Sequence, residues 1–156
     1  MGVHGHSGTD SRLGRGDMKR AINLILVLVF AAGLVACSDL NSERIHAAYV
    51  TTGGGHARAG RNDIRKYGCN ACHTIPGVPG AHGLVGPPLD GIGNREYIAG
   101  EVPNTAANLM RWIQHPHQVE PHTVMPEMGV TEEDSRDIAA YLYTLRERGL
   151  MLCIGR

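Results

Sequence analysis

At 156 residues the chain has room for one folded domain and short flanking segments. Its 15 basic and 15 acidic side chains balance, so no basic surface indicates a nucleic-acid-binding protein. The single phenylalanine, Phe30, lies in an apolar N-terminal run, which leaves Trp112 and the five tyrosines as the large aromatic side chains for a core. So few large apolar groups favour a domain whose interior is filled partly by a bound group.

An export signal is predicted over residues 18–36. It begins with a short basic stretch from Met18 to Arg20, and residues 21–36 are apolar and end in small side chains. This run of 16 residues is short for a membrane span, which needs roughly 20. We therefore expect a cleaved signal, with an uncleaved anchor as the alternative. We also expect residues 1–17 to be an extension upstream of the true start.

Residues 34–37, Leu-Val-Ala-Cys, resemble the lipobox of bacterial lipoproteins, in which the cysteine receives a diacylglycerol and becomes the new N-terminus. Several acyl chains on Cys37 hold a protein stably on a bilayer, whereas one chain holds it only marginally. The expected location is the periplasmic side of a bacterial membrane. If Cys37 is not modified, an ordinary signal-peptidase site predicts a soluble periplasmic protein. Residues 37–57 are polar and glycine-containing, and we expect a flexible, lipid-anchored tether there.

Two helices are predicted in the first part of the domain. The first covers residues 58–68 and leads directly into Cys69. The second begins at Asn104 or Thr105 and ends before Pro116, because proline interrupts a helix. Its apolar stripe consists of Leu109, Trp112 and Ile113.

A third helix follows Thr131, which forms a capping-box pattern with Asp134. Three acidic residues in its first turn suit the positive end of the helix dipole. Gly149 is the expected stop. Long glycine- and proline-rich loops at 76–103 and 116–130 separate the helices, and such loops are reasonable where they cover a cofactor. The apolar stripe of the third helix consists of Ile138, Tyr141, Leu142 and Leu145.

The five residues from Cys69 through Cys72 to His73 form C-x-x-C-H, the motif of covalent haem attachment. Each thiol adds to a vinyl group of the porphyrin, and the histidine ligates the iron on its proximal side. The alternatives are a dithiol redox pair, half of a zinc site and a structural disulfide. The histidine and the export signal favour haem, since bacterial haem attachment takes place outside the cytoplasm. One copy of the motif predicts one haem c.

From about Gly60 to Arg146 the chain resembles class I cytochrome c, the His/Met-ligated electron-transfer family. After the haem motif, residues 86–95 read Gly-Pro-Pro-Leu-Asp-Gly-Ile-Gly-Asn-Arg, similar to the family's G-P-x-L-x-G-x-x-x-R stretch. The resemblance implies an all-α cytochrome c fold, with about three to five short helices and long loops wrapped around one covalent haem. The domain is expected over 58–149, followed by a tail over 150–156.

The resemblance also implies roles for residues around the haem. The Pro87 carbonyl accepts a hydrogen bond from the His73 ring, which orients the imidazole and raises its basicity. Leu89 packs on the haem and Arg95 lies near a propionate. Trp112 is the aromatic residue that the family has at the start of the distal segment.

Residues 112–126 resemble the distal segment of the family, which ends in P-x-T-x-M, and this resemblance places the sixth iron ligand at Met125. A thioether is soft and neutral, so it favours ferrous iron. Pro121 and Pro126 bracket the loop and restrict it. The other candidates for the sixth ligand are Met110, Met128, His115, His117 and His122.

The expected function is one-electron transfer without substrate chemistry, because two axial ligands leave the iron no open position. Respiratory partners are expected, such as a dehydrogenase or quinol oxidoreductase on one side and a terminal oxidase on the other. One alternative is a cytochrome subunit fixed in a larger oxidase or dehydrogenase complex. Another is a peroxidase or gas-sensing haem protein, in which the sixth position opens.

Overall fold

The computed structural model describes the backbone of residues 15–146 and, except at 15–17 and 31–40, the side chains as well. The side chain of Cys37, the stop expected at Gly149 and the tail over 150–156 therefore lie outside the described residues, as does most of the extension over 1–17. The chain divides into two compact units, Met1–Asp39 and Leu40–Arg156, which are described separately.

The predicted export signal lies within the long helix α1, Arg15–Thr51. Every residue described from Met18 to Phe30 is exposed, including the large apolar side chains of the signal. Among the residues described, no helix reaches the length and hydropathy that a membrane crossing requires.

The segment expected to be a flexible tether is helical up to Thr51 and packs against the domain. Ala48 is 2% exposed and Thr52 is 5% exposed. The Thr52 hydroxyl donates to the Ala48 carbonyl (2.8 Å) and accepts from the Gly55 N–H (3.1 Å). This differs from the expectation because residues 40–51 contain no glycine or proline. The glycines that follow end the helix and turn the chain, as the positive φ of Gly53 shows.

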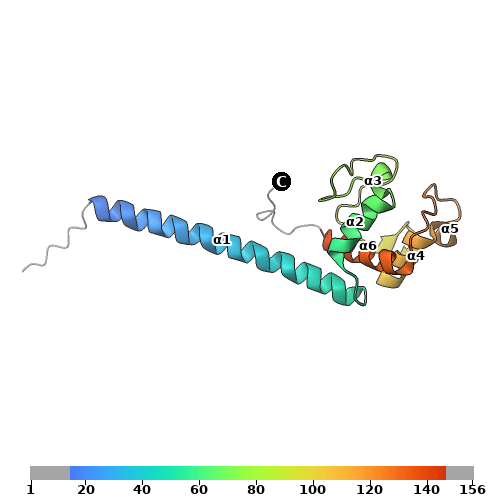
Figure 1. Ribbon diagram of the computed structural model, residues 1–156, viewed down its shortest axis with the longest axis horizontal. Coiled ribbons are helices and arrows are strands. Elements are labelled where there is room, and N and C mark those ends of the chain that lie inside the picture. Colours follow the sequence, from blue (N-terminus) through green and yellow to red (C-terminus); the bar gives the residue numbers. More distant parts are fainter. Residues whose placement is uncertain (1–14, 147–156) are drawn as a thin grey trace, which may run out of the picture. The chain divides into compact units, whose positions relative to one another are not determined.

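Helices α2 (Ala57–Lys66) and α6 (Glu132–Thr144) cross and form the largest helix contact of the domain (Figure 1). Gly60 makes this crossing possible, because a Cβ atom there would lie 1.9 Å from the carbonyl oxygen of Asp137. The Asp137 carboxylate also accepts the His56 N–H at the start of α2 (2.7 Å). The first helix was therefore predicted correctly, with its end two residues earlier than expected.

The caps of the other two helices were also predicted correctly. In α4, Ala106–Gln114, the Thr105 hydroxyl accepts the N–H of Asn108 (3.2 Å). In α6 the Thr131 hydroxyl accepts the N–H of Asp134 (3.1 Å). The helix α6 ends at Thr144, five residues before the expected glycine.

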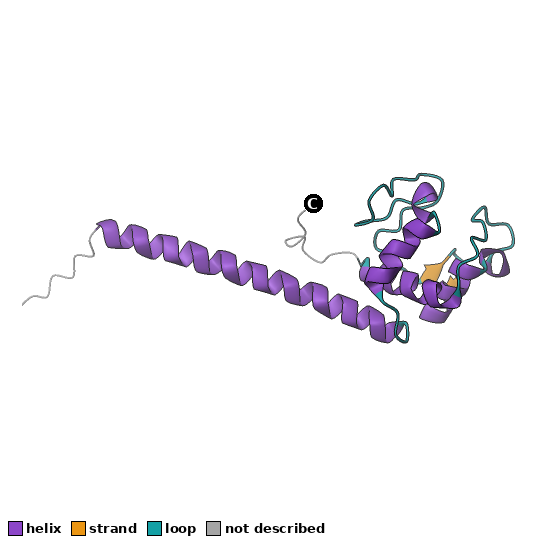
Figure 2. Ribbon diagram, viewed as in Figure 1, coloured by secondary structure: helices purple, strands orange, loops and turns teal. Residues whose placement is uncertain are grey.

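Pro116 ends α4, as expected, and also begins a further short helix, α5 (Pro116–Val119). Proline is suited to the first turn of a helix because backbone N–H groups there have no partner within the helix, so the lack of an N–H costs no hydrogen bond. The remaining regular elements are short: the α3 turn (Cys69–Cys72), the 3₁₀ turn η1 (Ile92–Asn94), and strands β1 (Tyr97–Ile98) and β2 (Val102–Pro103). The strands pair antiparallel in a small hairpin, which was not predicted (Figure 2).

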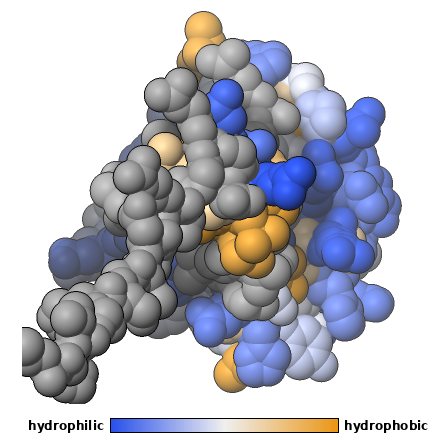
Figure 3. Space-filling view, turned by 90° about the vertical axis from the view of Figure 1, so that its left-hand side faces the viewer, coloured by the Kyte–Doolittle hydropathy of each residue, from blue (hydrophilic) through white to orange (hydrophobic). Residues whose placement is uncertain are grey.

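The core lies where α2, α4 and α6 meet, and it is small and mostly aliphatic. Ile64, Leu109 and Ile138 are among its fully buried side chains. A polar link crosses it, since Gln114 on α4 donates to the hydroxyl of the buried Ser135 on α6 (3.0 Å). Among the residues coloured in Figure 3, hydrophilic side chains predominate, with a hydrophobic group near the centre of the view. Helices predominate and the only sheet described has two strands, so the predicted all-α class is confirmed.

Candidate functional site

The C-x-x-C-H motif forms one helical turn, α3, directly after α2. Gly68 precedes this turn with φ +71°, a left-handed conformation that glycine adopts without strain. Cys69 and Cys72 stand three residues apart in α3, and residues at that spacing share a face of a helix. His73 follows in extended conformation, and its N–H donates to the Cys69 carbonyl (3.0 Å). Local backbone structure therefore places the two thiols and the imidazole together.

Both cysteine side chains of the motif are partly buried. Burial raises the pKa of the Cys69 thiol above its ordinary value. Cys72 lines the cleft described below, whereas Cys69 packs against the hydrophobic core.

The loop after the motif folds back along it. The N–H of Gly86 donates to the Cys72 carbonyl (2.8 Å), and the N–H of Leu89 donates to the Thr74 carbonyl (2.9 Å). The Thr74 hydroxyl donates to the Gly83 carbonyl (3.0 Å). A Cβ atom on Gly83 would lie 2.3 Å from the Ala71 carbonyl oxygen. Glycine at this position therefore allows the loop to lie directly on the motif.

The imidazole of His73 is fixed from two sides. Its Nδ1 lies 2.7 Å from the Pro87 carbonyl oxygen, the contact that the family resemblance implied. Because a carbonyl can only accept, Nδ1 carries the proton and Nε2 keeps a free lone pair. The backbone of Gly86 lies against the ring, and a Cβ there would be 2.3 Å from Cε1. The ring therefore has the tautomer and the orientation that a metal ligand needs.

A cleft of about 770 Å³, including its open mouth, lies beside His73. It is enclosed by side chains from the motif, the following loop, the hairpin, α4 and the distal loop. Its lining consists of Cys72, His73, Val85, Gly86, Pro87, Leu89, Ile92, Arg95, Tyr97, Ile98, Ala99, Trp112, Thr123, Val124, Met125 and Pro126.

The cleft brings together seven of the eight residues predicted to contact the cofactor, all except Cys69. It also separates the candidates for the sixth ligand. Met125 lines the cleft, and none of the other five candidates does. The three histidines are exposed, as is Met128, and Met110 packs against the core.

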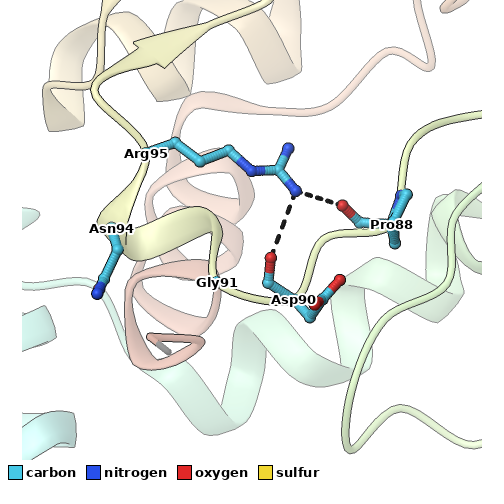
Figure 4. A pocket seen from close by; sticks show the side chains of 5 residues that line it. All are labelled: Pro88, Asp90, Gly91, Asn94 and Arg95. Atoms are coloured by element: carbon cyan, nitrogen blue, oxygen red, sulfur yellow. Dashed lines mark hydrogen bonds between the residues drawn. The ribbon is translucent and has the colours of Figure 1, made fainter. Parts of the chain in front are cut away.

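Arg95 stands at the edge of the cleft and also lines a smaller hollow beside it (Figure 4). Its guanidinium donates through one nitrogen to the carbonyls of Pro88 and Asp90, the second at 3.3 Å. The other guanidinium nitrogens remain as donors for an anionic group at the cleft edge.

The hairpin formed by β1 and β2 supplies part of the cleft wall, and this part was not predicted from the sequence. Tyr97, Ile98 and Ala99 all line the cleft, and Ala99 has φ +55°, unusual for a residue other than glycine. Asn104 holds this wall in place, because its side-chain amide donates to the carbonyls of Ile92 (2.8 Å) and Arg95 (2.9 Å). The apolar pair at 97–98 beside Gly100 was the available signal, but it lay within a stretch assigned to loop.

The lining suits a flat, largely apolar group with acidic substituents. Val85 and Val124 line the cleft and are 74% and 85% exposed, so a porphyrin bound there would cover apolar surface. The two thiols of the motif serve covalent attachment. An imidazole with a free Nε2 lone pair and a thioether suit the two axial positions, and a guanidinium suits a propionate. The residues present therefore fit haem c.

Comparison with known proteins agrees with this site. The family model described as Cytochrome c matches residues 57–146, more than half of the chain. Cytochrome c oxidase subunit 2 of Alkalihalophilus pseudofirmus is 35% identical over 91 residues, which are 58% of this chain and 26% of that protein. The chain thus matches about a quarter of the relative's length. No solved structure matched significantly. The chain therefore belongs to the cytochrome c family and is an electron-transfer protein with covalently bound haem c.

Proposed function

We propose that the protein is a one-electron carrier in which His73 and Met125 are the two axial ligands of the haem iron. The observation that carries this proposal is the composition of the cleft. His73 and Met125 line the same cleft beside the attachment motif, and Met125 is the one candidate for the sixth ligand that reaches it.

The protein's own groups prepare the site for fast electron exchange. When bound, the haem supplies an iron that cycles between the ferric and ferrous states. The Pro87 carbonyl holds the His73 ring in one orientation, so little reorganisation is needed when the charge changes. The thioether of Met125 favours the ferrous state relative to a second imidazole. The guanidinium of Arg95 offsets the negative charge of a propionate.

The two axial ligands distinguish a carrier from a haem enzyme or gas sensor. A peroxidase or sensor needs an open sixth position, whereas His73 and Met125 together fill both positions. The proposal therefore requires that Met125 keep external ligands from the sixth position of the iron. Carbon monoxide added to the reduced protein tests this, and a carrier should not bind it readily at neutral pH.

Export and membrane attachment belong to the same proposal. The apolar residues of 18–30 are exposed in α1, and such a run is unstable in water unless it is removed or covered by lipid. Lipidation at Cys37 would keep the carrier on the periplasmic side of a bacterial membrane. Mass spectrometry of the mature N-terminus tests this. A soluble periplasmic form without a lipid is the outcome that contradicts it.

The proposed partners are respiratory redox proteins, with a dehydrogenase or quinol oxidoreductase as donor and a terminal oxidase as acceptor. A second candidate function is a cytochrome subunit fixed in an oxidase or dehydrogenase complex. It is supported by the relative at 35% identity, which is itself an oxidase subunit. Solubilisation in mild detergent separates the two, because a fixed subunit co-purifies in constant stoichiometry and a mobile carrier does not.

Replacement of the proposed sixth ligand tests the carrier function directly. In Met125→Ala we expect the oxidised protein to lose the long-wavelength band of His/Met ligation, and the reduced protein to bind carbon monoxide at neutral pH. Met128→Ala is the matched control, because this exposed methionine does not line the cleft. Parental spectra in Met125→Ala, or the same loss in both variants, contradict the assignment.

A further inference from the structure

The loop that presents Met125 is held by few interactions. In the described structure, residues 121–130 take part in three hydrogen bonds that connect them to one another or to Glu120. Pro121 and Pro126 have no N–H and contribute none. Whatever holds Met125 in place before and during ligation must therefore act through these few bonds or through packing.

Glu120 supplies the acceptors of two of these bonds. Its carboxylate oxygen Oε1 accepts the N–H of His122 at 2.8 Å, and its carbonyl accepts the N–H of Thr123 at 3.1 Å. The residue precedes Pro121, which restricts its backbone to extended conformations, and its φ and ψ are −133° and 99°. Glu120 thus closes a turn with Pro121 at its second position, a favoured position for proline.

Thr123 connects this turn to the ligand. The Thr123 hydroxyl accepts the N–H of Met125 at 3.2 Å, and the Thr123 side chain itself lines the cleft. The contacts therefore run from the Glu120 carboxylate to the backbone of His122, then through Thr123 to the backbone of Met125. A carboxylate is the strongest acceptor in this chain of contacts, because a charged acceptor makes a stronger hydrogen bond than a neutral one.

We propose that Glu120 is a positioning residue for the sixth haem ligand: its carboxylate fixes the turn 120–123 and so holds Met125 facing the cleft. The inference rests on the proposed function, since it takes Met125 as the ligand. Glu120 does not line the cleft and acts only through the loop. Without its side chain the turn keeps the backbone bond to Thr123 but loses the bond to His122, so Met125 leaves its position more often.

Competition with imidazole measures how firmly Met125 is held. Imidazole added to the oxidised holoprotein displaces a thioether only from the fraction of molecules in which that ligand has left the iron. Glu120→Ala should bind imidazole about three- to tenfold more tightly than the parent, the range expected for loss of one partly exposed hydrogen bond. Glu120→Gln keeps an acceptor oxygen but loses the charge, so its affinity for imidazole should lie between those of the parent and Glu120→Ala.

Glu127→Ala is the matched control. Glu127 lies in the same loop, two residues after Met125, is exposed and makes no side-chain hydrogen bond in the described structure. It should bind imidazole as the parent does. Amide hydrogen exchange provides a second readout, because the His122 N–H should exchange faster in Glu120→Ala, at an intermediate rate in Glu120→Gln and at the parental rate in Glu127→Ala.

The outcomes separate this inference from the proposed function. Parental imidazole affinity in Glu120→Ala, or the same increase in Glu127→Ala, overturns the role of Glu120 while the ligand assignment stands. Unchanged spectra in Met125→Ala overturn the ligand assignment and this role with it. Tighter imidazole binding with unchanged exchange at His122 also overturns the inference, because the effect would not pass through the turn.

Discussion

Replacing Gly86 with alanine places a methyl group against the imidazole of His73. The added Cβ would lie 2.3 Å from Cε1 and 2.6 Å from Nδ1 of the ring. Gly86 is not among the glycines with positive φ, so the alanine backbone itself is unstrained. An ordinary contact needs about 3.4 Å or more. Either the ring or the loop must therefore move by about 1 Å.

Both movements break a described contact. If the ring turns, Nδ1 leaves the Pro87 carbonyl, and if the loop moves, the bond from the Gly86 N–H to the Cys72 carbonyl lengthens. Overpacking costs about 1–3 kcal/mol and a lost hydrogen bond about 0.5–1.5 kcal/mol. We expect Gly86→Ala to lower the free energy of unfolding by about 2–4 kcal/mol, which for a domain of this size lowers Tm by about 8 °C or more.

Thermal and urea unfolding of the holoprotein measure the loss, and the low-spin spectrum of the oxidised haem reports on the His73 ligand. Gly80→Ala is one control, because nothing lies within 4 Å of its added Cβ and only the positive φ opposes it. Gly83→Ala is a second, because its Cβ meets the backbone of Ala71 and Cys72 and not the ring. It should lower Tm with the parental spectrum. A Gly86→Ala protein within about 0.5 kcal/mol of the parent would refute the reasoning.

Two further predictions concern α6. Gly60→Ala should separate α2 from α6 and lower the free energy of unfolding by about 1–3 kcal/mol, although alanine has the better helix propensity. Urea unfolding measures this loss. Unchanged stability contradicts the close crossing of the two helices. Hydrogen bonds from Lys66 and Tyr67 lower the pKa of Asp134 below its usual 3.8, so this carboxylate stabilises the fold above that pH and loses its effect as the pH falls through the lowered pKa. Asp134→Asn should therefore lower the free energy of unfolding by roughly 1 kcal/mol at pH 7, mainly by weakening the bond to Tyr67. In acid unfolding, the difference between variant and parent should disappear below the lowered pKa. A difference that stays constant across pH contradicts the assignment.

Haem attachment could be predicted from the sequence because the two thiols and the imidazole lie within five consecutive residues. Cys69 and Cys72 with His73 form one turn whose geometry depends on local backbone structure. The caps at Thr105 and Thr131 were equally legible, since each joins residues three apart. Such short-range patterns keep their meaning wherever the segment packs.

Tertiary structure decided what depends on residues far apart in the chain. Met125 was placed by resemblance alone, and only the folded cleft separates it from Met128, three residues away. The hairpin wall at 97–99 contributes through its position opposite the motif, which no local pattern encodes. The segment around Ala48, expected to be a flexible tether, is a helix whose Ala48 side chain is buried against the domain. Tertiary packing of this kind provides most of the stability of a helix, and it depends on residues outside the segment. The sequence alone thus determined that the chain attaches haem, and the fold determined which side chains surround it.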